Sequence, residues 1–165
     1  APVFLILDLI ESALYPHPCR FGIGLGPMLT SIRPDLSIGA DGPAFWNARE
    51  AIKSVHAQDD YGRTRTRLMG CADLHAPLIN SLLATTDGIK RSFTDLQRNT
   101  FFSLLREGIY SDSFDQQAAA ERLGITPEAF YRRLKISGIK LYLRSRADLS
   151  AWLTRQLEAA KGDRE

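Results

Sequence analysis

The second half of the chain is organised around residues 116–139, which read QQAAAERLGITPEAFYRRLKISGI. Ala120 and Leu123 fall on one face of a first helix, and the small side chain of Ala120 allows a second helix to cross closely. Gly124 supplies the left-handed residue that a tight turn needs, and Ile125 fills the space between the helices. The pattern therefore predicts two short helices joined by a turn.

The second of these helices has a start signal and an amphipathic pattern. Thr126 is the expected N-cap and Pro127 the first helical residue. Phe130 and Leu134 lie four residues apart and are expected to be buried. The outward face then carries Thr126, Glu128, Tyr131, Arg132 and Lys135. This arrangement is typical of a helix-turn-helix whose second helix enters the major groove of double-stranded DNA. The same geometry also serves as a packing or dimerisation unit.

The distribution of charge favours contact with DNA. The 165 residues carry a formal net charge of only +2, which by itself indicates no partner. Residues 1–90 hold 8 Lys and Arg against 9 Asp and Glu, whereas residues 116–147 hold 7 against 2. Phosphate binding depends on such a local surplus, so we expect Arg133, Lys140 and Arg144 near the DNA backbone.

The stretch GITPEAFYRRLKISGI, residues 124–139, resembles the helix-turn-helix of the Fis type, which also ends NtrC-like activators. The similar features are the Gly-Ile turn, the apolar Phe130, the basic pair, Leu134 and the closing Gly-Ile. The resemblance implies DNA binding and regulation of transcription. Modules of this kind often act as dimers, so a homodimer is an expected assembly.

The first half begins with a predicted helix over residues 3–14. Its residues are apolar except at Asp8, Glu11 and Ser12, which share one stripe at helical spacing. We expect this polar stripe to face solvent and the rest of the helix to be buried. Further along, Thr94 and Gln97 match a capping box, which predicts the start of a later helix. We place a domain boundary near residues 88–94, giving domains 1–90 and 91–165.

A glycine-rich strand is the most distinctive feature of the first half. Residues 20–26 read RFGIGLG, in which Phe21, Ile23 and Leu25 alternate with glycines. A bare strand face indicates close approach of another group to the backbone. We favour a helix packed on the glycines; the alternative is the base or phosphate of a nucleotide. A short strand at 29–32, a helix from Pro43 to about residue 55 and a strand at 64–69 are expected to follow.

Three segments together resemble the SatD family: RFGIGLGPMLTSI at 20–32, IGADGPAFWNAREAI at 38–52 and INSLLATTDGIK at 79–90. With the C-terminal helices, the resemblance extends over most of the chain. It implies an α+β protein: a ferredoxin-like α/β domain of the nucleotide-cyclase type, followed by an all-α DNA-binding-like tail, with a proposed role in acid tolerance. Because the chain begins at Ala1 and not at Met, we expect the first strands of the α/β domain to be missing.

Class III nucleotide cyclases carry a similar helix of the form GDxVNxAAR. Asp41, Gly42, Ala48 and Arg49 match this form, but Phe45 stands where a cyclase has its catalytic Asn. The metal-binding Asp of an early cyclase strand is also missing, and cyclase chemistry requires carboxylates that hold two metals. We therefore expect no cyclase activity and name no catalytic residue. Binding of a nucleotide stays as the alternative function, with candidate residues Gly22, Gly24, Gly26, Asp41 and Arg49.

Other classes of site are weakly indicated. Cys19 and Cys71 are far apart, so neither a disulfide framework nor a zinc site is predicted, and no metal or other cofactor is expected. No apolar run approaches the length of a membrane span, and the two isolated thiols suit the cytoplasm. Arg63, Arg65 and Arg67 alternate along a predicted strand, which fits either an exposed face or contact with a phosphate.

Overall fold

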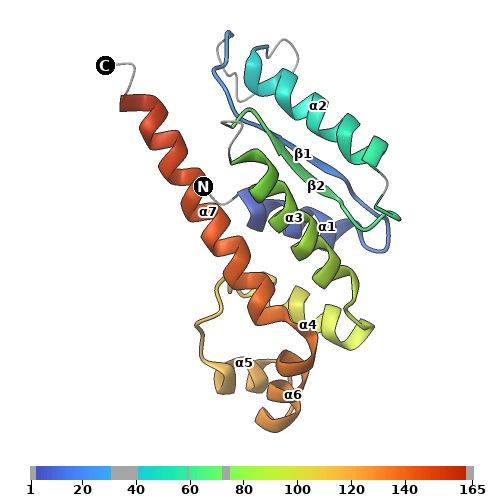
Figure 1. The fold of residues 1–165 in the computed structure, drawn as a ribbon. Helices are drawn as coiled ribbons and strands as arrows, with labels where there is room; N and C mark the ends of the chain where they lie inside the picture. Colours follow the sequence, from blue (N-terminus) through green and yellow to red (C-terminus); the bar gives the residue numbers. More distant parts are fainter. Residues whose placement is uncertain (1–2, 31–40, 59, 72–74, 163–165) are drawn as a thin grey trace. The chain divides into compact units, whose positions relative to one another are not determined.

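The computed structural model describes residues 3–30, 41–58, 60–71 and 75–162, and these form an α+β protein (Figure 1). Its contacts divide the chain into two compact units. One, the helical unit, comprises Ala1–Pro18 and Ile89–Glu165; the other, the α/β unit, is Cys19–Gly88. The predicted boundary near residue 90 lies close to the second of these breaks. The first 18 residues, however, belong with the helical unit and not with the α/β unit.

The α/β unit is built on a strand–helix–strand repeat. Strand β1 (Phe21–Gly24) is followed by helix α2 (Pro43–Gln58) and strand β2 (Thr66–Met69). The two strands pair in parallel, from Phe21 opposite Thr66 to Gly24 opposite Met69. Parallel neighbours require a crossover connection, which α2 provides. Of the strand expected at 29–32, residues 29 and 30 are not in a strand, and 31 and 32 lie outside the described residues.

Helix α3 (Ala76–Arg91) closes the outer edge of β2 with two polar side chains. Asn80 Oδ1 accepts from Leu68 N at 2.9 Å, and Asn80 Nδ2 donates to Leu68 O at 2.9 Å. Two turns later, Asp87 Oδ2 accepts from the backbone N–H groups of Arg65 and Thr66 at 2.8 and 2.7 Å. An unpaired strand edge would leave these backbone groups without partners. The helix therefore takes the place of a third strand.

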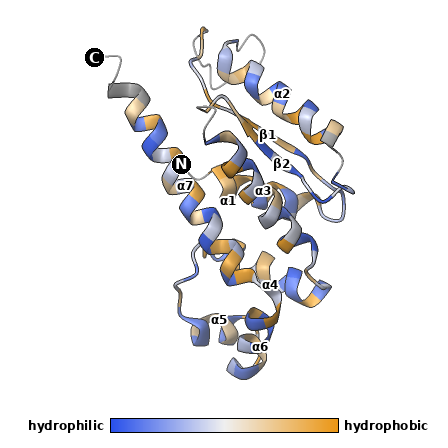
Figure 2. Cartoon of the chain, viewed as in Figure 1, coloured by the Kyte–Doolittle hydropathy of each residue, from blue (hydrophilic) through white to orange (hydrophobic). Residues whose placement is uncertain are grey.

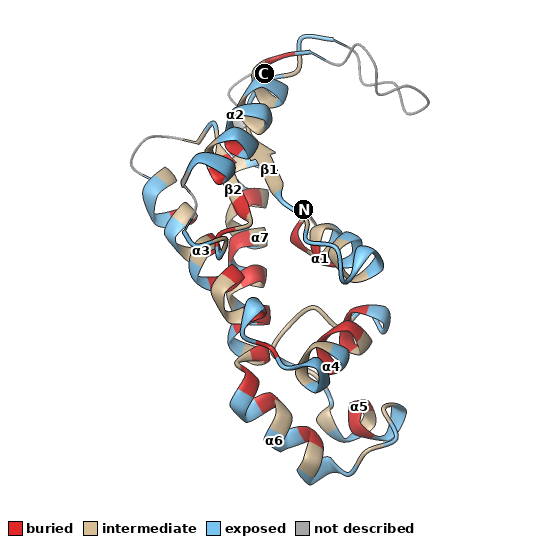
Figure 3. Cartoon of the chain, turned by 90° about the vertical axis from the view of Figure 1, so that its right-hand side faces the viewer, coloured by how far each residue is buried: buried red, intermediate tan, exposed pale blue. Residues whose placement is uncertain are grey.

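The helical unit contains α1 (Val3–Leu14), the end of α3, α4 (Asp95–Arg106), α5 (Gln116–Arg122), α6 (Pro127–Ser137) and α7 (Ile139–Gly162). Its core is aromatic: the rings of Phe101 and Tyr142 meet edge to face at 5.2 Å, and Phe93 lies 5.7 Å from Phe101. Buried positions occur on α4 and along the first turns of α7 (Figure 3). Along α7, apolar and polar residues alternate as expected for a helix with one buried side (Figure 2). The predicted capping box at Thr94 is confirmed.

The expected orientation of α1 is wrong. Asp8 is 2% exposed, whereas the apolar side chains of Ile6, Leu9, Ile10 and Leu14 are 40–49% exposed. The helical spacing correctly groups the polar residues on one stripe, but that stripe faces inward. Periodicity reports which residues share a face and not which face meets the protein, and buried polar partners decide the orientation here.

These partners form a buried polar cluster around Asp8. The Tyr142 hydroxyl lies 2.7 Å from each carboxylate oxygen of Asp8, the Tyr110 hydroxyl donates to Oδ2, and Lys90 Nζ lies 2.7 Å from Oδ1. Lys90 also pairs with Glu11. Burial, followed by the nearby Tyr142 and Asp8, raises the pKa of Tyr110 far above its ordinary value, so this hydroxyl keeps its proton. The cluster explains why the first 18 residues join the helical unit.

Candidate nucleic-acid interface

Helices α5 and α6 are joined by the tight turn that the sequence predicts. The Asp115 side chain caps α5 by accepting from Ala118 N at 3.0 Å. Gly124 has φ +65°, and Ile125 N donates back to Ala120 O at 3.1 Å. A side chain at φ +65° is strained, which is the physical reason for glycine at this position.

Helix α6 begins and ends as its sequence predicts. Thr126 Oγ1 accepts from Ala129 N at 3.2 Å, and Pro127 occupies the first helical turn. At the other end Gly138 adopts φ +73°, and α7 begins at the fully buried Ile139. The apolar spacing of Leu149, Trp152 and Leu153 predicts a last helix only from about residue 147, but α7 (Ile139–Gly162) begins eight residues earlier. The caps fix both ends of α6 within the helical unit.

The inner side of α6 is packed and its outer side is bare. Phe130 is fully buried and Leu134 is 4% exposed, and the Phe130 ring meets Phe114 edge to face at 6.3 Å. Ala120 of α5 is also fully buried, as a close helix crossing requires. These observations confirm the predicted inward positions. Helix α6 is therefore packed against the helical unit on one side only.

The five residues expected on the outer face of α6 are all exposed: Thr126, Glu128, Tyr131, Arg132 and Lys135. Four of them, together with Pro127, line a shallow hollow along the helix. Among the residues that the structure describes, neither Arg132 nor Lys135 makes a hydrogen bond or ion pair. Their charges are therefore available to an external partner.

The other basic residues expected at the interface already have protein partners. Arg133 is half-buried, and its Nη1 lies 3.4 Å from Thr100 Oγ1. Lys140 Nζ lies 5.9 Å from the centre of the Phe114 ring, a cation–π contact. Arg144 remains 59% exposed and lies 3.9 Å from Asp112, a distance typical of a weak surface pair.

One basic residue of the 116–147 surplus is not at the surface. Arg146 is 2% exposed and its guanidinium lies 5.1 Å from the centres of the Phe4 and Tyr142 rings. Its charge stabilises the helical unit from within and cannot meet a phosphate directly. Counting charges along the sequence therefore overstates the basic surface.

The glycine face of β1 is covered by helix α2. A Cβ atom on Gly22 would lie 2.3 Å from Ala48 O, and one on Gly24 would lie 1.9 Å from Ala44 O. Such distances are far below van der Waals contact, so the helix backbone approaches as closely as glycine permits. The favoured interpretation, a helix packed on the glycines, is confirmed at these two positions. Gly26 also faces the start of α2: a Cβ atom on Gly26 would lie 2.9 Å from Ala44 N.

The two polar candidates for nucleotide binding are not brought together. Asp41 Oδ1 accepts from Gly42 N at 2.8 Å and from Trp46 Nε1 at 2.6 Å, so its carboxylate fixes the start of α2. Arg49 is exposed on α2, and no hydrogen bond or ion pair between described residues joins it to Asp41. Within the described ranges no cluster of three or more His, Cys, Asp or Glu side chains could hold a metal ion.

A protein-family model matches most of the chain. No curated protein and no solved structure matches the chain. Across the described residues, no helix has the length and apolar character needed to cross a membrane. The model of the SatD family matches residues 1–153, which include the α/β unit, the Asp8 cluster and helices α5 and α6. The chain therefore belongs to the SatD family.

Proposed function

We propose that this protein binds double-stranded DNA through helix α6 and regulates transcription. The observation that carries the proposal is the outer face of α6, which presents Thr126, Glu128, Tyr131, Arg132 and Lys135 to solvent on a helix packed from behind. A recognition helix needs this combination, because base readout depends on side chains held in fixed positions. In this proposal α5, the turn at Gly124 and α6 form a helix-turn-helix module of the Fis type.

The residues of the proposed interface divide into those that would contact base edges and those that would contact phosphates. Arg132 has the planar fork that recognises a guanine edge with two hydrogen bonds, and Glu128 can accept from a cytosine amino group. Lys135 lies about one turn beyond Arg132 and about two turns beyond Glu128, and it supplies a point charge for a phosphate. Arg144 needs to release only its weak contact with Asp112 to add a second phosphate contact. Arg133 and Lys140 are proposed to lie near the DNA backbone, where each would have to share its charge with the contact it makes to Thr100 or Phe114.

The remaining parts of the chain fit this function as follows. The α/β unit is proposed to be a cyclase-like domain that has lost cyclase chemistry, since Phe45 replaces the catalytic Asn and no metal cluster occurs among the described residues. A homodimer would present two α6 helices to half-sites one helical turn apart. A regulator of this kind works on chromosomal DNA in the cytoplasm. Nucleotide binding is not proposed as a second function, because α2 covers the glycine face.

The proposal is tested by selecting bound sequences from a pool of random duplexes with the full chain. The selected duplex is then titrated by fluorescence anisotropy at several salt concentrations. We expect Arg132→Gln combined with Lys135→Gln to weaken binding at least tenfold and to lower the slope of log K against log salt by about 1 to 2. Lys53→Gln, which removes an exposed cation on α2, is the matched control and should leave the affinity and the salt slope unchanged.

Two results would contradict the proposal. One is the absence of measurable affinity for any duplex at low salt, where phosphate contacts are strongest. The other is a double variant that binds with the same affinity and the same salt slope as the parent protein, because the proposed face would then make no contact.

A further inference from the structure

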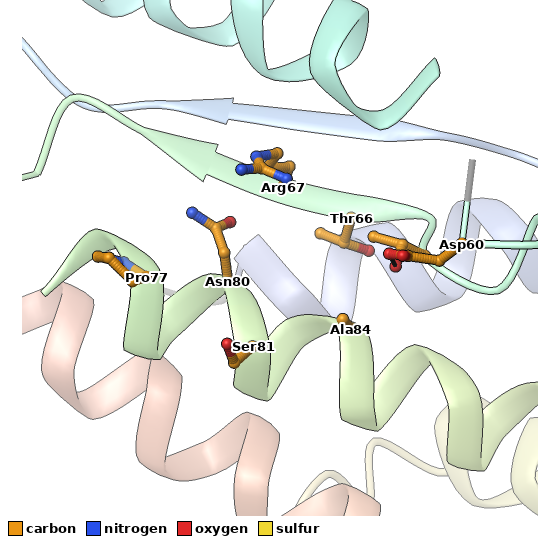
Figure 4. Close-up of a pocket in the computed structure, with 8 residues that line it drawn as sticks. Asp60, Thr66, Arg67, Pro77, Asn80, Ser81 and Ala84 are labelled. Atoms are coloured by element: carbon orange, nitrogen blue, oxygen red, sulfur yellow. Dashed lines mark hydrogen bonds between the residues drawn. The ribbon is translucent and has the colours of Figure 1, made fainter. Parts of the chain in front are cut away.

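The α/β unit contains a polar pocket that the proposed DNA contact does not use. It has a volume of ≈ 290 Å³ and lies between β2 and α3 (Figure 4). Its polar lining comes from three segments: Asp60 and Thr64 before β2, Thr66 and Arg67 on β2, and Asn80 and Ser81 on α3. All of these residues belong to the α/β unit. The pocket is therefore complete within one compact unit.

Most polar groups in the pocket are already satisfied within the protein. Asn80 bonds to both backbone groups of Leu68, and its second N–H donates to Ala76 O at 2.9 Å. The Thr66 hydroxyl donates to Asp87 at 3.2 Å and the Thr64 hydroxyl donates to Asp60 Oδ2. These side chains build the walls, and they leave Arg67, Ser81 and one oxygen of Asp60 to meet a ligand.

Arg67 is the group that indicates a ligand. Its Nε is buried and has no hydrogen-bond partner, and no ion pair to Arg67 occurs among the residues that the structure describes. A guanidinium always carries its charge, and a buried N–H without an acceptor is unfavourable. The alternating arginines of this segment allowed for contact with a phosphate, and Arg67 is the one that lines a pocket.

The pocket also has a negative end. Figure 4 shows Asp60 and Thr66 toward one end, and Arg67, Asn80 and Pro77 toward the other. Only one oxygen of the Asp60 carboxylate is occupied by Thr64, so the other can accept from a ligand. An anion alone would be attracted by Arg67 and repelled by Asp60. A ligand with opposite charges at its two ends satisfies both.

We propose that this pocket binds a small zwitterion, with its carboxylate or phosphate group on Arg67 and its ammonium group on Asp60. The Arg67 fork suits the two oxygens of either anionic group. Ser81, exposed on α3, adds a hydroxyl donor at the pocket. The volume accepts a molecule of the size of an amino acid or of an amino alcohol phosphate.

Four probes test this proposal by isothermal titration calorimetry on the full chain: L-serine against acetate, and phosphoethanolamine against inorganic phosphate. In each pair only the first compound carries an ammonium group. We expect one of the two zwitterions to bind saturably and more tightly than its partner, and the better pair identifies the anionic group. Arg67→Gln, which keeps a polar side chain but removes the guanidinium and its charge, should weaken that binding by about tenfold or more.

Two further variants separate the pocket from the rest of the surface. Asp60→Asn should remove the preference for the compound with the ammonium group while the anion still binds. Arg63→Gln, at an exposed arginine in the same segment, should change nothing. Far-UV circular dichroism establishes that each variant is folded. The proposal is overturned if neither zwitterion binds saturably, or if folded Arg67→Gln binds as tightly as the parent protein.

Discussion

Replacing Asp8 with alanine should be one of the most damaging single changes in this protein. The carboxylate is 2% exposed and accepts from the hydroxyls of Tyr142 and Tyr110 while pairing with Lys90. Its removal takes away the carboxylate that accepts from both tyrosine hydroxyls, and it takes away one of the two carboxylates that pair with Lys90. Breaking a buried ion pair from one side typically costs about 3–5 kcal/mol.

That cost is large against the whole stability of such a domain, which is about 5–15 kcal/mol. We expect Asp8→Ala to lower the free energy of unfolding by about 3–5 kcal/mol and to release α1 from the helical unit. Glu11 keeps Lys90 partly compensated, which places the expected value at the lower end of this range. Urea unfolding followed by far-UV circular dichroism measures the change from the shift of the midpoint.

A matched control comes from an exposed ion pair. Glu50 and Lys53 lie 2.6 Å apart on α2 with side chains 57% and 61% exposed, so Glu50→Ala should cost at most about 0.5 kcal/mol. The reasoning is refuted if Asp8→Ala lowers the free energy of unfolding by less than about 1 kcal/mol. The buried cluster would then contribute no more to stability than apolar packing at the same place.

Three other predictions rest on separate features. The folded state holds the Tyr110 proton more tightly than the unfolded chain does, because the pKa of Tyr110 is raised on folding. The contribution of Tyr110 to stability is therefore complete below the ordinary tyrosine pKa of about 10 and declines above it by up to about 1.4 kcal/mol per pH unit. Tyr110→Phe should flatten this decline in urea titrations from about pH 9 to about pH 11, and an equal slope in both proteins would contradict the assignment. Gly24→Ala should lower the free energy of unfolding by about 1–3 kcal/mol or more, since the added Cβ would meet the backbone of α2. Gly88→Ala, whose added Cβ meets no atom within 4 Å, should instead stabilise α3 by about 0.5–1 kcal/mol. Equal melting temperatures for the two variants would contradict the packing of α2 on β1. Asn80→Ala should lower the free energy of unfolding by about 2–3 kcal/mol, because it leaves the N–H and C=O of Leu68 without their side-chain partners. The amide hydrogen of Leu68 should then exchange rapidly with solvent. Slow exchange at this amide would contradict the prediction, because another group would then cover this edge of β2.

Features that depend on neighbouring residues could be predicted from the sequence. The turn at Gly124, the cap at Thr126 and the αL stop at Gly138 each involve groups within a few residues of one another. The same holds for the buried pair Phe130 and Leu134, which helical spacing places on one face. The outer face of α6, on which the proposed function depends, follows from those two positions.

Features that depend on residues far apart in the chain could not be predicted from the sequence. Asp8 meets partners 82 and 134 positions away at Lys90 and Tyr142, so no local pattern reveals that it is buried. Asn80 and Asp87 lie within a stretch that reads as an ordinary amphipathic helix, and only pairing with β2 gives them their role. Arg67 is one of three alternating arginines until the fold encloses it in a pocket.

The sequence by itself determined the local geometry of the helices at 116–139, the family and the glycine strand, because helix caps, turns and close backbone approach are encoded in adjacent residues. The tertiary structure alone decided which side of α1 is buried, which basic residues remain at the surface and where an unsatisfied arginine faces a pocket. Burial and charge compensation depend on which distant side chains meet, and that is settled only when the whole chain packs.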